Sequence, residues 1–474
     1  MNGLMLPKAK GATALMLLAG VAAFASPAFA QVKTGLATQV KPVAPKPAAS
    51  TPATSRGTQE APVPGNPDYA PTPGAAVPPP PPPPLPPVVW DLVSAEDLLS
   101  YIQQVGKDGL NPADYDPAGL ASAIQSGNPA VVSPIATDRF NRLSNDLALG
   151  HVRKPARIDW WIVDKDIDPA KQDALLRSVM AQHNLRQTLD GLLPTHPQYA
   201  ALKAALEMTP ATDTAKINRI RLNMDRWRWL PRDLGQKYII VNVPGFHATL
   251  VENGVNRWKQ RAIAGKLSTP TPQLNATAVG VILNPAWNVP KSIEKEAAGK
   301  KGFIPIKAPD GKRVLYWQQP PGPTNALGQV KFVMPNSKAI YLHDTNARSR
   351  FNDSTRALSH GCVRTQHILD LATELLGDDG GQWTPDKIQA TLDSKKTVQA
   401  NFVKPLPVYI VYFSAAALID GKIVDYKDLY GRDSKAMAAM QMKDGGASLT
   451  PPKVKPEDQA SVPAKPKKEV ATRN

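Results

Sequence analysis

The stretch Ala357-Leu358-Ser359-His360-Gly361-Cys362-Val363-Arg364 contains the single cysteine of a 474-residue chain. It leads into residues 365–376, which we expect to be a helix because apolar residues recur on one face, at Ile368, Leu371, Ala372 and Leu375. A thiol just before a helix N-terminus lies in the positive end of the helix dipole, and Arg364 adds a nearby cation. We therefore expect a favoured Cys362 thiolate, with the amides of Gly361 and Cys362 free to hold an oxyanion.

A nucleophilic cysteine needs a base, and two histidines are candidates. His360 precedes Cys362 by two residues, and His343 ends the apolar run 339–343. Sequence spacing alone does not choose between them. The alternative, two histidines at strand ends beside a buried and inert cysteine, stays open at this point.

The wider surroundings of Cys362 predict a mostly β domain over residues 216–442. Short runs with a period of two occur throughout it, and Asn253-Gly254 between two of them is a strong hairpin signal. The runs that we expect to be strands are 238–243, 248–251, 255–263, 279–283, 339–343 and 408–413.

Residues 89–215 predict a helical domain, because apolar residues there recur at helical spacing between Pro, Gly and Asp punctuation. Ser94, followed three residues later by Asp97, predicts a helix start resembling a capping box. Nothing in this domain indicates catalysis. The predicted fold class is therefore an α+β multidomain chain, with a helical domain before a mostly β domain.

Both ends of the chain differ in composition from these domains. Residues 1–30 have the order of a secretory signal, with two lysines, an apolar run and a small-residue site that predicts cleavage after Ala30. An uncleaved anchor is the alternative. Residues 31–88 hold 18 prolines, which predicts a disordered, extended linker. Residues 443–474 return to Lys, Pro and Ala, and predict a disordered tail.

The charge balance favours an anionic partner. Lys and Arg number 56 against 40 Asp and Glu, a formal net charge of +16. With an export signal, an anionic cell-wall polymer is the expected partner rather than nucleic acid. No later stretch predicts a membrane span once the signal is removed. One cysteine also rules out an internal disulfide, so Cys362 is either inert or retained for chemistry.

His343, then a spacer, then Ser359-His360-Gly361-Cys362-Val363-Arg364 resembles the signature of the L,D-transpeptidases, with their YkuD-type catalytic domain. The similarity is to the larger subfamily from Gram-negative bacteria, in which a helical scaffolding domain precedes the catalytic one. It covers roughly residues 90–432. Further matching segments are Arg226-Trp227-Arg228-Trp229-Leu230-Pro231, Gly265-Lys266, Thr269-Pro270-Thr271-Pro272, Asn284-Pro285, Trp287-Asn288-Val289-Pro290, Pro321-Gly322, Asn325-Ala326-Leu327-Gly328 and Pro335-Asn336.

This resemblance implies a role for each residue of the motif. Cys362 would be the nucleophile and His343 the general base, with Gly361 and Cys362 as oxyanion donors. The residues that would shape the site or touch substrate are Ser359, His360 and Arg364. Asp344 would point away from His343 in a continuing strand, so we do not expect its carboxylate to orient the imidazole.

The resemblance also implies a reaction. A cysteine thiolate would attack the amide after the third residue, diaminopimelate, of a tetrapeptide stem, release D-alanine, and pass the acyl group to an amine of another stem. The alternatives are an L,D-carboxypeptidase, attachment of envelope proteins to peptidoglycan, and a non-catalytic wall-binding scaffold. No metal or other cofactor would be needed. The expected location is the periplasm, with carbapenems as inhibitors and other cell-wall enzymes as further candidate partners.

Two departures from the larger relatives stand out. They carry a separate peptidoglycan-binding module after the scaffold, whereas the link 209–215 leaves no room for one. The segment 284–330, which caps the active site in relatives, is also short; its aromatics Trp287 and Tyr316 would either line the cleft or serve ordinary packing. A papain-like peptidase fits poorly, because its histidine follows its cysteine in the chain.

Overall fold

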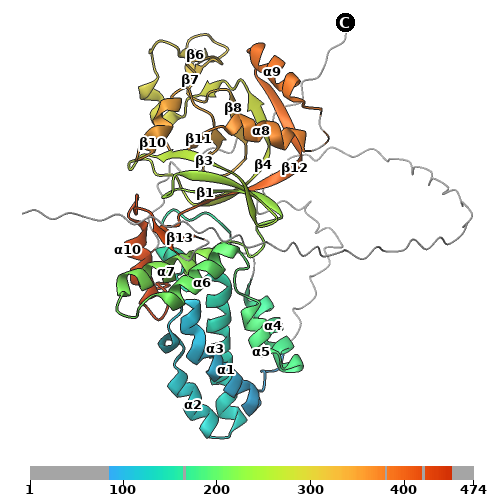
Figure 1. The fold of residues 1–474 in the computed structure, drawn as a ribbon, viewed down its shortest axis with the longest axis vertical. Coiled ribbons are helices and arrows are strands. Elements are labelled where there is room, and N and C mark those ends of the chain that lie inside the picture. The colour runs from blue at the N-terminus through green and yellow to red at the C-terminus, as the bar shows by residue number, and fades with distance from the viewer. Residues whose placement is uncertain (1–84, 164–166, 379, 381, 419–421, 451–474) are drawn as a thin grey trace, which may run out of the picture. The chain divides into compact units, whose positions relative to one another are not determined.

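The computed structural model describes residues 85–163, 167–378, 380, 382–418 and 422–450. The predicted signal segment, nearly all of the predicted linker and most of the predicted tail lie outside these residues. The described chain forms a helical domain followed by a mostly β domain, as the sequence predicts (Figure 1). Its α-helices are α1 (Leu92–Gln104), α2 (Pro117–Gln125), α3 (Pro129–Leu149), α4 (Pro169–Gln182), α5 (Leu185–Asp190), α6 (Pro197–Met208), α7 (Thr214–Arg228), α8 (Ile368–Gly377), α9 (Pro385–Asp393) and α10 (Arg432–Met440).

The helical domain starts three residues earlier than the capping-box prediction at Ser94. Asp91 is the N-cap of α1: its carboxylate accepts the Ser94 amide at 2.8 Å and the Ser94 hydroxyl at 2.7 Å. A carboxylate at the N-cap satisfies an amide that the first turn leaves free, so Asp91 takes the role expected of Ser94. The apolar faces of α1 to α5 then enclose one core around Trp90, Leu98 and Phe140.

The β domain is built on a nine-stranded sheet. Its strands are ordered β10-β3-β11-β9-β8-β4-β12-β1-β2, and β2 also pairs with β3, so that the sheet closes on itself. Asn253 and Gly254, both with positive φ, make the β2–β3 turn, which confirms the predicted hairpin. The strands are β1 (Lys237–Asn242), β2 (His247–Glu252), β3 (Val255–Gly265), β4 (Leu274–Leu283), β5 (Trp287–Asn288), β6 (Ile304–Lys307), β7 (Val314–Gln319), β8 (Val330–Val333), β9 (Leu342–His343), β10 (Ala357–Ser359), β11 (Val363–Thr365), β12 (Val398–Val411), β13 (Ala415–Ala417) and β14 (Ile423–Asp425).

Helix α8 covers this sheet and fills its core. Helix α8 contacts β8 and β12, and Figure 1 shows it next to β8. The apolar face predicted for residues 365–376 is confirmed, because all four of its members are buried among strand residues: Ile368, Leu371, Ala372 and Leu375. Side chains of β8, β9 and β11 enter the same core at alternate positions. The positions between them therefore lie on the other face of the sheet.

A second core joins the two domains, and α7 lies within it. Ile220 and Met224 of α7 pack with Tyr199 of α6 and with Tyr409 and Val411 of β12. The predicted domain boundary, between residues 215 and 216, therefore falls inside the first turn of a helix that serves both domains. The buried residues of α7 contact both the helical domain and the β domain. The apolar periodicity of the helix alone therefore cannot assign it to one domain.

The ordered chain also runs past the predicted end of the β domain at residue 442. Residues 443–450 turn back on the helical domain, where the Gly445 carbonyl accepts the Arg153 amide at 2.8 Å and Leu449 packs on the shared core. The Lys-, Pro- and Ala-rich composition of the tail gave no indication of these contacts. The prediction of a disordered tail is therefore wrong for its first residues, and from 451 onward it lies outside the described residues.

Asp225 on α7 is the anchor of this junction, which yields a stability prediction. Its fully buried carboxylate accepts the amides of His151 and Val152, at 2.7 and 3.1 Å, and the Trp229 indole N–H at 2.8 Å. Replacing Asp225 by Ala leaves those donors buried without partners, so we expect the free energy of unfolding in urea to fall by about 3–5 kcal/mol.

The matched control for Asp225 is Asp386→Ala, which removes the same charge from an exposed position in α9. We expect that variant to change the free energy of unfolding by less than about 0.5 kcal/mol. Equal values for the two variants would show that the junction does not depend on the buried carboxylate.

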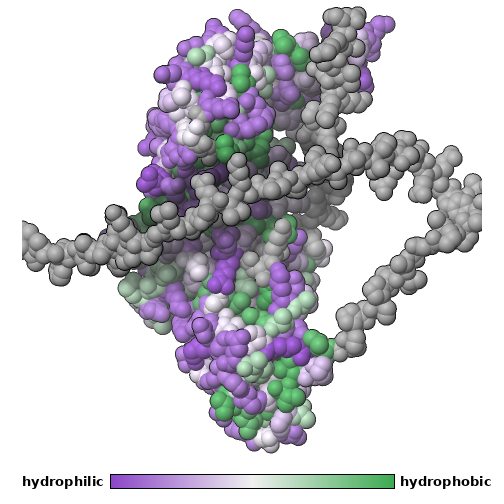
Figure 2. All heavy atoms as spheres, turned by 90° about the vertical axis from the view of Figure 1, so that its right-hand side faces the viewer, coloured by the Kyte–Doolittle hydropathy of each residue, from purple (hydrophilic) through white to green (hydrophobic). Residues whose placement is uncertain are grey.

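The face shown in Figure 2 carries many hydrophilic side chains, with hydrophobic side chains in separate patches. Within the described ranges, no helix has the length and apolar character that a membrane crossing requires.

Candidate active site

Ser359 and Gly361 set the shape of the turn that presents Cys362. The Ser359 hydroxyl donates to the Cys362 carbonyl at 2.5 Å and accepts the Gly361 amide at 3.2 Å. Gly361 has a φ of +113°, a region that favours glycine, and its carbonyl accepts the Thr271 hydroxyl at 2.7 Å. Ser359 is only 2% exposed, so it stabilises the turn from the buried side.

The expectation of a free Gly361 amide is wrong, because that N–H donates to Ser359. The Cys362 amide differs: among the described residues no acceptor is recorded for it. An oxyanion formed at the sulfur would therefore find its backbone donor at Cys362 rather than at both residues.

The helix expected directly after Cys362 begins later. Strand β11 follows the cysteine, and α8 starts only at Ile368, with His367 as its N-cap. An extended strand carries the chain about 3.3 Å per residue, and the dipole effect fades beyond the first turn of a helix. The dipole argument for a favoured thiolate is therefore wrong.

Strands β8, β9 and β11 bring three polar side chains into one row. His343 on β9 lies opposite Lys331 of β8 and opposite Arg364 of β11. Their chain neighbours Val330, Phe332, Leu342 and Val363 are buried in the core beneath. Because side chains alternate along a strand, Lys331, His343 and Arg364 share the face opposite that core.

Cys362 and Tyr341 lie one step along from this row. The Cys362 side chain is partly exposed, and its thiol donates to the Ala339 carbonyl at 3.7 Å. Burial of the surroundings raises the pKa of the Cys362 thiol. The Tyr341 amide and hydroxyl, and then Lys331 and Arg364, lower that pKa and offset part of the rise. The resting sulfur is a protonated thiol rather than a thiolate.

His343 is held as a neutral imidazole. Its Nδ1 lies 2.5 Å from the Asp344 carbonyl oxygen, which only accepts, so Nδ1 carries the proton and Nε2 is left as the acceptor. Burial, then the Arg364 charge, with Lys331 adding to them, lowers the pKa of His343 to about 3. The imidazole ring also packs edge-on against Tyr341, with centroids 5.5 Å apart.

The structure thus places Cys362 directly before β11, whose Arg364 lies opposite His343 of β9. In the described chain, no hydrogen bond joins the sulfur to the imidazole. The Asp344 carboxylate instead accepts the Gln329 amide at 2.9 Å and pairs with Arg348 at 2.8 Å. The backbone carbonyl of Asp344, rather than its carboxylate, orients the imidazole, as expected from strand alternation.

His360 does not join this pair. Its Nε2 lies 3.1 Å from both the Lys266 amine and the Glu296 carboxylate, and its side chain is 29% exposed. It belongs to a polar cluster at the rim, built from three separate segments. Among the described residues, therefore, His343 is the histidine best placed to act as a base.

Residues 236–404 match the family model of the YkuD-type L,D-transpeptidase catalytic domain, and residues 91–206 match the model of a scaffold domain. The first match contains the Cys362 turn and the whole row of strands described above. The two matches leave α7 between them, in agreement with its place in the shared core.

Individual relatives carry the same name. A Haemophilus influenzae protein called "Putative L,D-transpeptidase" is 33% identical over 240 residues, which are 45% of this chain and 48% of that protein. The chain therefore aligns with about half the length of this relative. Solved L,D-transpeptidases from Mycobacterium smegmatis and Enterococcus faecium, the latter a mutant, align at 15% and 12% identity. The alignment with the M. smegmatis structure covers 37% of this chain and 58% of that chain, with a TM-score of 0.20. The alignment with the E. faecium structure covers 38% of this chain and 52% of that chain, with a TM-score of 0.22.

Two residues of the β domain escaped the residue-level analysis as neighbours of the sulfur. Tyr341 helps to lower the pKa of the Cys362 thiol, and the Lys331 amine lies 4.0 Å from the Tyr341 ring centre. Trp287 was one of two aromatics expected either in the cleft or in packing. It packs against a small apolar cluster of Val289, Ile293 and Ala297. Alternation along 339–343 was the signal that could have revealed Tyr341, since 341 and 343 share a face.

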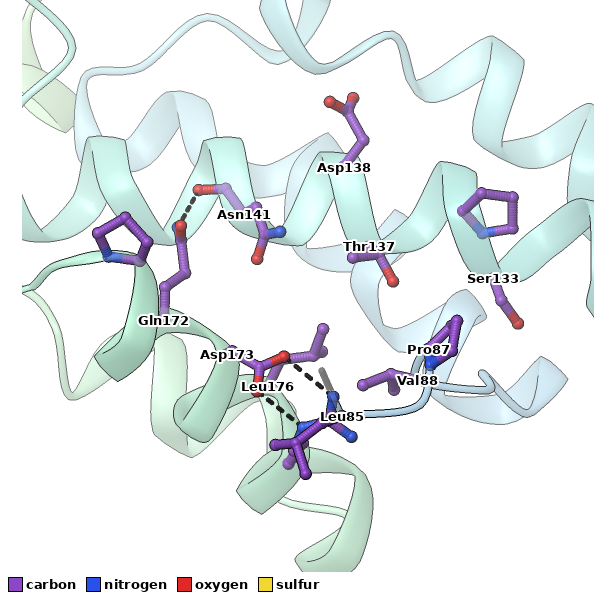
Figure 3. A pocket seen from close by; sticks show the side chains of 13 residues that line it. Leu85, Pro87, Val88, Ser133, Thr137, Asp138, Asn141, Gln172, Asp173 and Leu176 are labelled. Atoms are coloured by element: carbon purple, nitrogen blue, oxygen red, sulfur yellow. Dashed lines mark hydrogen bonds and ion pairs between the residues drawn. The ribbon is translucent and has the colours of Figure 1, made fainter. Parts of the chain in front are cut away.

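A cavity of about 670 Å³ lies elsewhere, on the helical domain between α3 and α4 (Figure 3). Figure 3 shows Gln172 reaching Asn141, and beside it Asp173 is paired with Arg177 at 2.8 Å. The cavity lining includes no histidine or cysteine. In the described chain, no group of three or more His, Cys, Asp or Glu residues is arranged to hold a metal.

The protonation states of His343 and Cys362 predict an unusual pH profile. The lowered pKa of His343 keeps the imidazole able to accept a proton until the pH falls toward about 3, and the raised pKa of Cys362 keeps the sulfur protonated at neutral pH. We expect the rate of acylation by an uncharged ester to stay level between about pH 5 and 8. Stopped-flow measurement of thioester formation tests this, and a rate that falls as the pH drops through about 6.5 would indicate a base with the ordinary pKa of histidine instead.

Proposed function

We propose that this chain is a peptidoglycan L,D-transpeptidase that uses Cys362 as nucleophile and His343 as general base. The observation that carries the proposal is the register of β9 and β11, which pairs His343 with Arg364, two residues after Cys362, within the segment that matches this family's model. Diagonal neighbours across strands are roughly 7–8 Å apart at their Cα atoms. Rotation of the Cys362 side chain away from the Ala339 carbonyl would turn the sulfur toward Nε2.

The first half-reaction acylates the enzyme. The sulfur attacks the carbonyl carbon of the third residue, diaminopimelate, in a tetrapeptide stem, while its proton moves to Nε2 of His343. The Cys362 amide donates to the developing oxyanion. When the carbon–nitrogen bond breaks, Nε2 returns the proton to the leaving nitrogen, and free D-alanine departs from a thioester.

The second half-reaction transfers the acyl group. An amine on the third residue of another stem loses a proton to His343, attacks the thioester carbonyl and expels the sulfur, which leaves an amide between two third positions. Water in place of the amine gives a carboxypeptidase, and a protein amine gives an envelope protein attached to the wall. These acceptors share the first half-reaction, so the same acyl-enzyme serves all of them.

The proposed location is the periplasm, where peptidoglycan stems are accessible. The composition of residues 1–30 and the net charge of +16 support it, since the first indicates export and the second suits an anionic polymer. Stem peptides are the proposed substrates, and carbapenems are proposed to acylate the same sulfur.

The test is incubation of the purified chain with disaccharide tetrapeptide, followed by mass spectrometry of protein and products. We expect an adduct on Cys362, release of D-alanine and a dimer linked through third residues. Tripeptide without dimer would favour the carboxypeptidase. No adduct on any residue would contradict the enzymatic proposal and leave the wall-binding scaffold.

A further inference from the structure

Lys331 and Arg364 are cations without anionic partners at the reaction site. No ion pair or hydrogen bond is recorded for either side chain among the described residues, and the Arg364 Nε is buried without an acceptor. The nearest acid along the chain from His343, Asp344, is already engaged by Arg348 and the Gln329 amide. Buried or half-buried charges are costly unless something pairs with them.

These two cations flank His343 on both sides. Each lies opposite it in the strand register, and adjacent strands are about 4.8 Å apart. The Lys331 amine reaches back over the Tyr341 ring, and both cations act electrostatically on Cys362 and on His343. An anion lying over the imidazole would therefore meet a positive charge on each side.

The chemistry of acyl transfer places such an anion there. To protonate the leaving nitrogen, the His343 Nε2 must come within hydrogen-bond distance of it. In a peptide that ends in D-alanine, the carboxylate carbon is two bonds beyond that nitrogen. The carboxylate of the leaving residue therefore lies beside the imidazole, between the two cations.

We propose that Lys331, with Arg364 on the other side of His343, binds the terminal carboxylate of the acyl donor. These two cations select acyl donors that have a single residue after the scissile bond and in which that residue carries a free carboxylate. This inference rests on the proposed function and extends it from the nucleophile to donor selection. Lys331 is the new element, a specificity residue supplied by β8, which is distant in sequence from the cysteine motif.

The experiment compares two donors that differ only at this group: disaccharide tetrapeptide and the same molecule with its D-alanine carboxylate converted to a carboxamide. Rates of acyl-enzyme formation are measured by intact-protein mass spectrometry over a range of donor concentrations. For the unmodified chain we expect kcat/KM to be roughly tenfold to hundredfold higher with the free acid, the range of a charge-assisted hydrogen bond.

Lys331→Met keeps most of the apolar stem of the side chain and removes its charge. We expect it to lose most of the preference for the free acid, chiefly through KM, so that the ratio of kcat/KM for the free acid to kcat/KM for the carboxamide falls toward one. Lys331→Arg should restore the preference. Lys216→Met, which removes the same charge from an exposed position at the start of α7, should leave both rates unchanged.

The outcomes separate this inference from the function on which it rests. If the unmodified chain forms no adduct with either donor, the proposed function fails and the inference fails with it. If it acylates both donors equally, the inference alone is overturned. An equal loss on both donors in Lys331→Met would also overturn it, because the lysine would then serve the sulfur rather than the substrate carboxylate.

Discussion

The Cys362→Ala chain is expected to form no acyl adduct and to lose transpeptidation by at least about 10⁴-fold, because no other residue supplies the attacking atom. Cys362 is the single cysteine of the sequence, so no second thiol can replace it. The measurement is the initial rate of dimer formation from disaccharide tetrapeptide, together with the mass of the protein after incubation.

The fold should tolerate this change. The Cys362 side chain is partly exposed, and the hydrogen bonds of its turn come from Ser359 and the backbone. We expect the melting temperature to move by no more than a few degrees. Turnover that survives in a folded Cys362→Ala chain would contradict the thioester route, and a preserved cellular role without turnover would favour the scaffold.

The second large effect is expected at His343. Replacement by Gln removes the proton acceptor, and general-base loss typically costs about 10²–10⁴-fold in rate. In this variant only the fraction of Cys362 that is already ionised to thiolate can attack the donor. Because burial raises the pKa of Cys362, we expect its acylation rate to climb about tenfold per pH unit up to about pH 9, while the rate of the unmodified chain stays level.

His367→Asn is the matched control for His343→Gln. His367 is exposed at the N-cap of α8 with a φ of +53°, a conformation that Asn tolerates. We expect its rates to stay within about twofold of the unmodified chain at every pH. A level pH profile in His343→Gln, with little loss of rate, would mean that another group accepts the proton.

The parts of the fold carried by local pattern could be predicted from sequence. Asn253-Gly254 predicts its hairpin because two consecutive residues with positive φ suit that pair. The apolar face of α8 follows from helical spacing over three turns. The Cys362 motif gave the turn itself, although its hydrogen bonds differ from the expected ones.

The start of α8 could not be predicted in the same way. Strand β11 is three residues long, too short for a period of two to be recognised, and it is held by pairing with β9 and β3 rather than by its own sequence. The segment after Cys362 was therefore assigned to the helix. Pairing of β11 with its neighbouring strands therefore set the start of α8, which the local sequence propensity did not determine.

The row of polar side chains was also beyond sequence reasoning. Lys331 lies 31 residues before Cys362 in the numbering, and only the register of β8 on β9 sets it opposite His343. Register depends on how the whole sheet closes. A lysine on a short strand otherwise has the pattern of an ordinary solvated side chain.

The raised pKa of Cys362 has a consequence for the resistance of the proposed nucleophile to oxidation. Peroxide attacks thiolates far more readily than thiols, so a sulfur whose pKa is raised reacts slowly with oxidants. In the proposed reaction the sulfur becomes strongly nucleophilic only as its proton moves to His343. The single cysteine of the sequence is thereby spared much of the oxidation that a permanently ionised thiol would undergo.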